Sequence, residues 1–133
     1  MRYLLDTNVC VRYLNDPNSV VTRRVRVTPP EDIVLCSIVK AELFYGAMKS
    51  NNPQRTLAVQ QQFLSQFISL PFDDHAAELY GRIRATLATQ GTPIGPNDLM
   101  IAAIALANDA TLVTRNVREF ERVGGLTLEN WEV

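Results

Sequence analysis

Carboxylate side chains stand at separate points of the sequence, each beside a short apolar run. Asp6, Glu42 and Asp98 come from three different segments, and a fourth segment supplies further oxygen groups. That fourth segment contains Thr114, Asn116 and Glu119. Oxygen ligands without histidine or cysteine favour a hard divalent cation such as Mg²⁺ or Mn²⁺. Such an ion polarises a phosphorus centre and activates water, so these residues predict phosphodiester hydrolysis wherever the fold brings them together.

Each of these residues also has an ordinary structural interpretation. Asp6 is a residue type that commonly caps helices, and the dipole of the helix that begins near Asp98 would stabilise its negative charge. Glu119 could be a solvated charge beside Arg118. Glu42 is the exception, because it lies among leucine, phenylalanine and alanine, where a carboxylate needs a partner.

The elements that must position these residues are short and alternate in type. Apolar runs predict strands at 2–5, 33–36, 110–114 and 126–128, with a short extended piece at 70–72. Caps and apolar spacing predict helices at 7–14, 20–27, 38–48, 54–69, 74–89 and about 97–108, with Ser37 and Asp73 as caps. Prolines and glycines at 29–30, 51–53 and 90–96 separate them.

This alternation predicts the α/β class: a three-layer α/β/α sandwich with a central, mostly parallel sheet, in a single domain spanning 1–133. The segment 99–107 is apolar on every side, so we expect a centrally buried helix. In a parallel sheet, the carboxyl ends of the strands and the starts of the following helices share one edge, where ligands bind. The chemistry-bearing residues all fall at that edge.

Composition excludes several functional classes. The chain has 133 residues, 47% of them hydrophobic and 20% charged, and a net charge of −1. It is therefore neither a disordered polyelectrolyte nor a basic nucleic-acid coat. The longest apolar run has nine residues, against about 20 for a membrane helix. An aspartate at position 6 and two isolated cysteines, Cys10 and Cys36, predict a cytoplasmic protein without a signal peptide, whose thiols are buried.

Nucleophilic schemes find little support in the residue types. The chain has a single histidine, His75, and no GxSxG motif. Of the 13 basic residues, all but Lys40 and Lys49 are arginine, whose planar fork suits phosphate. They gather at two places, around 23–26 and 115–122. We expect any nucleic acid to be held by these local groups.

Four sequence blocks resemble the VapC toxins of bacterial toxin–antitoxin pairs, which are small PIN-domain ribonucleases. The blocks are LLDTNV, SIVKAELFYGA, GTPIGPNDLMIAA and LVTRNVREFERVGGLTLENW, in the family's order and over nearly the whole chain. The resemblance implies that Asp6, Glu42 and Asp98 are catalytic acids that bind Mg²⁺ or Mn²⁺. It implies that Thr114 orients water or a carboxylate. The family's fourth acid is replaced by Asn116, and Glu119 follows three residues later.

The same resemblance implies a substrate and partners. The substrate is structured RNA, and the GTPIGPND and REFERV blocks are similar to those of relatives that act on initiator tRNA in the anticodon loop. The products are a 5′-phosphate and a 3′-hydroxyl. A homodimer and a neutralising VapB-like antitoxin are also implied, with operator DNA bound only through the antitoxin.

Three other classes of function are compared with the residues. A receiver-like phosphoacceptor domain needs paired acids at the first strand and a late lysine, but no lysine follows Lys49. A phosphatase of the HAD type needs an aspartate where Asn8 stands. A catalytically silent α/β binding module would have no need of the three acids.

Overall fold

Five short strands form one parallel sheet at the centre of the molecule. The computed structural model describes residues 1–133, and its strands are ordered β3-β2-β1-β4-β5. Their bounds are β1 (Tyr3–Leu5), β2 (Ile33–Cys36), β3 (Ile68–Leu70), β4 (Thr111–Val113) and β5 (Leu128–Glu129). Every residue of β2 and β4 is buried, which is typical of a parallel sheet covered on both faces. The predicted fold class is confirmed, and the sheet is parallel at every pairing.

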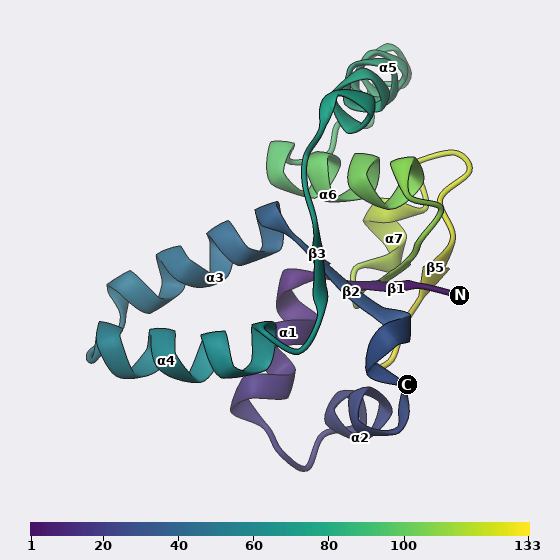
Figure 1. The fold of residues 1–133 in the computed structure, drawn as a ribbon. Coiled ribbons are helices and arrows are strands. Elements are labelled where there is room, and N and C mark those ends of the chain that lie inside the picture. The colour runs from purple at the N-terminus through teal and green to yellow at the C-terminus, as the bar shows by residue number, and fades with distance from the viewer.

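Helices cover both faces of this sheet. They are α1 (Thr7–Asn15), α2 (Val20–Val27), α3 (Ser37–Lys49), α4 (Pro53–Leu64), α5 (Asp74–Gln90), α6 (Pro96–Ala107) and α7 (Val117–Phe120), with a 3-10 turn at Pro30–Asp32. In Figure 1, α6 and α7 lie on one side of the strands, α1 and α2 on the other, and α5 packs outside α6. None of these helices is long and apolar enough to cross a membrane.

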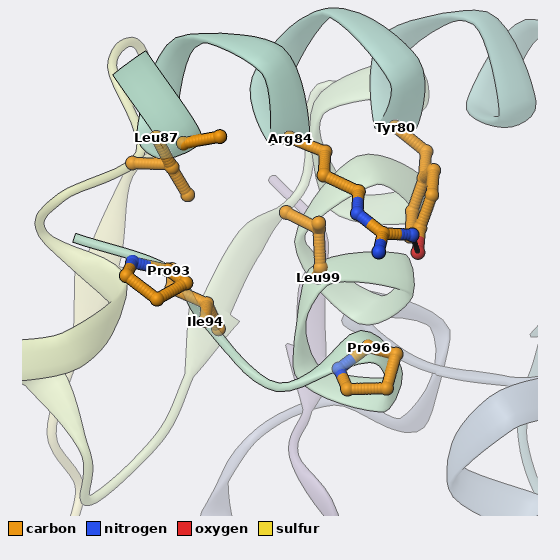
Figure 2. Close-up of a pocket in the computed structure, with 8 residues that line it drawn as sticks. Tyr80, Arg84, Leu87, Pro93, Ile94, Pro96 and Leu99 are labelled. Carbon is orange, nitrogen blue, oxygen red and sulfur yellow. Dashed lines mark hydrogen bonds between the residues drawn. The ribbon is translucent and has the colours of Figure 1, made fainter. Parts of the chain in front are cut away.

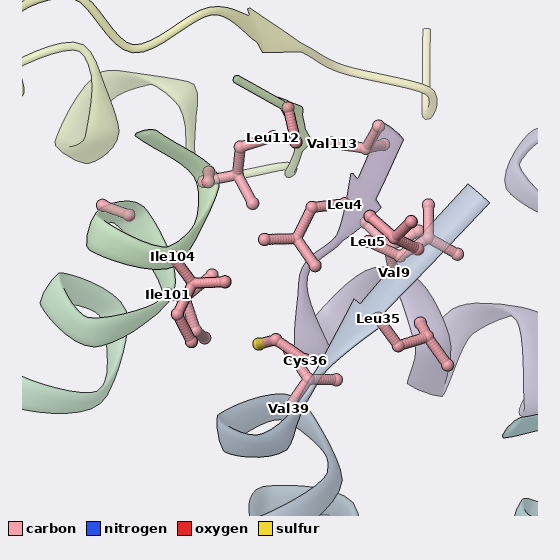
Figure 3. Close-up of a cluster of buried hydrophobic side chains, with 14 of the residues drawn as sticks. Leu4, Leu5, Val9, Leu35, Cys36, Val39, Ile101, Ile104, Leu112 and Val113 are labelled. Carbon is pink, nitrogen blue, oxygen red and sulfur yellow. The ribbon is translucent and has the colours of Figure 1, made fainter. Parts of the chain in front are cut away.

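The core is built from side chains that alternate between the two faces of the strands. Leu4 points toward Ile101 and Ile104 of α6, whereas Leu5 lies beside Val9 of α1 (Figure 3). Alternation with a period of two residues follows from strand geometry. The buried helix predicted at 99–107 is thus confirmed: it is the apolar layer on which one face of the sheet rests.

Several predicted boundaries were wrong, and tertiary pairing explains the largest error. The helix predicted over 54–69 ends at Leu64, and Ile68–Leu70 instead forms edge strand β3, with Ile68 paired to Val34. Hydrogen bonding to β2 outweighs the helical spacing of the apolar residues. The last strand lies at Leu128–Glu129 rather than 126–128, and the single-turn helix α7 was not predicted.

Two helix starts also differ from the prediction. Ser37 is the first residue of α3, and the cap position belongs to Cys36 without a side-chain bond. Helix α6 opens at Pro96 after Gly95, so Asp98 lies within its first turn. Asp73 caps α5 as expected, because its side chain accepts the amide hydrogen of Ala76.

Both cysteines are free and buried, as predicted. Burial raises the pKa of Cys36 to about 11 and raises that of Cys10 as well. A thiol that resists ionisation is a poor nucleophile, so the cysteines serve packing.

Candidate active site

Asp6 and Thr114 meet because their strands are neighbours in register. Leu5 of β1 pairs with Val113 of β4. Asp6 and Thr114 are the residues that directly follow these two strand ends. The amide of Asp6 donates to the carbonyl of Val113 at 2.9 Å. The Thr114 hydroxyl, fully buried, donates to Oδ2 of Asp6 at 2.8 Å. The sheet therefore fixes one side of the Asp6 carboxylate.

The other side of the same carboxylate caps a helix. Oδ1 of Asp6 accepts the amide hydrogen of Thr7, the first residue of α1, at 2.8 Å. The capping interpretation is thus correct, and it coexists with the contact to Thr114. Burial raises the pKa of Asp6, the two hydrogen bonds oppose that rise, and the charges of Glu42 and Glu119 add to it. Ionisation of this carboxyl group therefore costs more free energy here than in water.

Three further hydrogen bonds extend this arrangement to Glu42, Asn116 and Glu119. The Thr7 hydroxyl donates to Oε1 of Glu42, which projects from α3. On the opposite side, the amide of Asn116 donates to the Thr114 hydroxyl at 2.9 Å, and its side-chain amide donates to Glu119 at 2.8 Å. A continuous network therefore runs from Glu42 through Asp6 to Glu119.

Thr7 is the member of this network that the sequence interpretation missed. Its hydroxyl is the group that connects α1 to the carboxylate of Glu42 on α3. The available signal was its place between Asp6 and Asn8, since a side chain at the first turn of a helix faces the same edge as the cap. Glu42, which needed a partner among its apolar neighbours, finds it here.

Asp98 approaches the other carboxylates from α6. It is half-buried in the first turn of that helix. Burial, followed by the charges of Asp6, Glu119 and Glu42, raises the pKa of Asp98 to about 6. The charges that act on Asp98 come from acids at the end of β1, on α3 and on α7.

The four acids have no positively charged partner within the chain. The five ion pairs of the molecule join other residues, such as Arg12 with Asp16 and Arg115 with Glu132. No three carboxylate, histidine or cysteine side chains stand together in a metal-holding arrangement. The donors are nevertheless oxygen atoms only and their repulsion is uncompensated, which fits a hard divalent cation as the missing counter-charge.

Comparison with known proteins gives this edge its context. Residues 3–126 match the family model described as PIN domain. The chain is 43% identical over 131 residues to the "tRNA(fMet)-specific endonuclease VapC" of Shigella flexneri, covering 98% of both chains. It is 41% identical to "Ribonuclease VapC2" of Rickettsia felis over 133 residues, covering 99% of both.

A solved structure agrees with these relatives. The chain superposes with a TM-score of 0.92 on one in the crystal structure of DNA-bound VapBC from Salmonella typhimurium, at 40% identity and 98% coverage of both chains. The fold and its acidic edge thus define a PIN-domain protein. Within that class the chain belongs to the VapC ribonucleases, the toxins of VapBC toxin–antitoxin systems.

This membership decides between the classes left open by the residues. The chain is an enzyme, and the receiver-like and catalytically silent interpretations are set aside. Ribonucleases with a PIN domain are generally dependent on a divalent metal ion. The particular ligands in this chain stay a prediction.

The role of Thr114 is testable by removing only its hydroxyl. Thr114→Val leaves Oδ2 of Asp6 without a donor, and a hydrogen bond to a charged group contributes about 1.5–3 kcal/mol. We expect a loss of cleavage rate of about tenfold or more and a raised Mn²⁺ requirement, measured by metal titration of the cleavage rate. Thr114→Ser keeps the hydroxyl and is the control. Equal metal requirements for the valine and serine variants would contradict the role.

Proposed function

We propose that this chain is a Mg²⁺- or Mn²⁺-dependent endoribonuclease, the toxin of a VapBC pair, that cuts a structured tRNA. The observation that supports this most is the hydrogen-bonded network that joins Glu42, Asp6 and Glu119 at the carboxyl ends of the strands, without a positively charged partner. The chain's 43% identity to a relative named as specific for tRNA(fMet) supports the choice of initiator tRNA. The anticodon loop is part of the proposal because in-line attack needs an exposed single-stranded segment.

In this proposal Asp6, Glu42 and Asp98 hold the cation. When bound, the ion neutralises charge on the phosphate and lowers the pKa of the attacking water. The chain's own residues supply orientation: Thr114 and the amide of Thr7 each bind one oxygen of Asp6, and the Thr7 hydroxyl binds Glu42. Carboxylates fixed in this way need no reorganisation during the reaction.

The proposed reaction is an in-line displacement at phosphorus. Water forms the new P–O bond and gives a proton to the acidic cluster, and the P–O3′ bond breaks. The 3′ oxygen takes up a proton, so the products are a 5′-phosphate and a 3′-hydroxyl. An in-line approach needs a backbone that can splay, which single-stranded loops offer.

Phosphate contacts in this proposal come from few arginines. Arg24 is engaged with Glu129 at 3.6 Å and with the ring of Trp131, and Arg115 pairs with Glu132 at 3.6 Å. Arg118 and Arg122 make no ion pair and lie on or just after α7, the helix that carries Glu119. These two are the stronger candidates for holding the RNA backbone.

Glu119 is proposed as the fourth acid in place of Asn116. Glu119→Gln should raise the Mn²⁺ concentration needed for half-maximal cleavage more than Asn116→Ala does, because only the first change removes a charge from the cluster. Metal titrations of both variants against the wild-type enzyme provide the measurement. Negligible and equal effects would show that neither residue takes part.

The proposal includes two protein partners. Structures similar to this chain are VapBC complexes, two of which are bound to DNA, so we propose a VapB-like antitoxin and contact with operator DNA only through it. An arginine of the antitoxin placed in the acidic cluster would supply the missing positive charge. We also propose a homodimer.

The dimer has a direct test. Light scattering of the purified toxin across micromolar concentrations should give twice the mass of the chain. A monomer mass throughout that range would contradict it.

The function itself is tested with three substrates. Purified enzyme with Mg²⁺ or Mn²⁺ is offered total tRNA, ribosomes and an unstructured RNA, and the cleaved ends are sequenced. We expect one dominant cut, in the anticodon loop of initiator tRNA, carrying a 5′-phosphate. Even cleavage of the unstructured RNA with tRNA left intact would reject the proposal.

A further inference from the structure

A pocket of about 260 Å³ lies between α5 and the start of α6 (Figure 2). One wall is formed by Tyr80, Arg84 and Leu87 of α5. The opposite wall is formed by Pro93, Ile94 and Pro96, which come from the GTPIGPND block singled out in the sequence. Figure 2 shows Tyr80 and Arg84 projecting from α5 toward Pro96, across the opening. None of these residues belongs to the acidic site.

The proline wall is rigid before any ligand binds. Helix α5 ends at Gln90, and the following Gly91 has a φ of 71°, the left-handed conformation that reverses the chain. The amide of Thr92 then donates to the carbonyl of Leu87 at 3.0 Å. Two prolines fix φ at 93 and 96. Arg122 donates to the carbonyl of Pro93 at 3.3 Å. A pocket formed in advance loses little conformational entropy on binding.

The α5 wall combines an aromatic ring with a cation. Tyr80 and Arg84 are one helical turn apart, and Nη1 of Arg84 donates to the Tyr80 hydroxyl at 3.0 Å. The guanidinium lies 5.9 Å from the centre of the tyrosine ring. It forms no ion pair, so its remaining N–H groups are free to donate to a ligand.

This pocket adjoins the acidic edge through α6. Pro96 and Leu99 line the pocket, and Asp98 lies between them in the first turn of the helix. Asp98 itself does not line the pocket, because Pro96 and Leu99 share a face of α6 and Asp98 projects at a different angle from the same first turn. The pocket and the acidic edge thus both lie at the N-terminal end of α6.

We propose that the pocket binds one unstacked base of the RNA substrate, close to the bond that is cut. The inference rests on the proposed ribonuclease function and names a specificity site for it. A volume of about 260 Å³ is below the usual range for drug-sized ligands, roughly 300–1,000 Å³, and suits a single heterocycle. Aromatic and apolar faces stack on bases, and an arginine fork donates to base acceptors.

The test pairs variants of the protein with abasic substrates. RNA corresponding to the cleaved loop is prepared with a single abasic nucleotide at each position within three of the cut, and binding is measured in EDTA by fluorescence anisotropy. We expect Tyr80→Ala and Arg84→Gln each to weaken binding of intact RNA about tenfold, since stacking contributes about 1–3 kcal/mol per base. At one abasic position the affinity of the wild-type protein should fall by the same factor, because the base that fills the pocket is missing. The affinity of the two variants should not fall further at that position.

Arg82→Gln is the matched control, because it removes the same charge from the same helix but lies outside this pocket and pairs with Glu78. Wild-type cleavage of RNA with unchanged binding by both pocket variants would overturn the inference while leaving the proposed function intact. Absence of any RNA cleavage by the wild-type enzyme would reject the function itself. Two results together would assign the pocket to a second copy of the chain and overturn the inference. The Tyr80→Ala variant would change from dimer to monomer, and its loss of affinity would add to the loss caused by each abasic nucleotide.

Discussion

Replacement of any one of Asp6, Glu42 and Asp98 with the corresponding amide should lower the rate of RNA cleavage about a thousandfold or more. The amides keep the size of the side chains but remove charge from a cluster whose members interact electrostatically. Loss of several kcal/mol of transition-state stabilisation, at about 1.4 kcal/mol per tenfold in rate, gives this magnitude. Initial rates on the cleaved tRNA, with Mg²⁺ and with Mn²⁺, provide the measurement.

Asp74→Asn is the control for this series, because Asp74 is an exposed acid in the first turn of α5, away from the cluster. It should retain the wild-type rate. Circular dichroism of each variant establishes that the fold is preserved. Full activity in Asp98→Asn, or in the wild-type enzyme with excess EDTA, would eliminate the metal mechanism.

The order of strands and helices was largely predictable because short buried strands are locally conspicuous. The run Ile33–Cys36 is apolar throughout, and the prolines before it and the helical pattern after it leave one interpretation. Asp6 and Thr114 could likewise be placed at one edge, because every parallel strand of a covered sheet ends there.

What could not be predicted depends on pairing between distant residues. Residues 68–70 have the apolar spacing of the preceding helix, and only the neighbouring edge of β2 makes them a strand. The α7 turn is too short to show a periodic pattern. The link between Thr7 and Glu42 joins helices α1 and α3, so it needs their relative placement, which no local signal supplies.

The placement of the acidic residues at one edge of the sheet was predictable, but the hydrogen bonds that connect them were not. Sequence reasoning treated helix capping and catalysis as alternatives for Asp6. In the structure the same carboxylate caps helix α1 with Oδ1 and accepts a hydrogen bond from Thr114 with Oδ2. Such combinations arise because a helix start at a strand end is where amide donors and a binding edge coincide.

Asp98→Asn should have opposite effects on stability with and without metal. In metal-free protein at pH 7 the ionised Asp98 is disfavoured by burial and is also repelled by Asp6, Glu119 and Glu42, so the variant should melt at a higher temperature than the wild type. With Mn²⁺ at 100 times its Kd the wild type should gain about 2.7 kcal/mol, whereas the variant gains little. Thermal melts with and without Mn²⁺ reveal the crossover.

The pH dependence of this difference carries a definite sign. The pKa of Asp98 rises from 3.8 in the unfolded chain to about 6 in the folded one, so the folded state binds the extra proton between these values. The stability associated with that proton is fully present below pH 3.8 and is lost as the pH rises through 6. Without metal, the stability gained by Asp98→Asn over the wild type should therefore be largest above pH 6 and vanish toward pH 3.8. Stabilisation of the wild type by Mn²⁺ should weaken below pH 6, because protons compete with the metal for the carboxylate. An advantage that is independent of pH would show that the carboxylate of Asp98 is not subject to the repulsion on which the metal site depends.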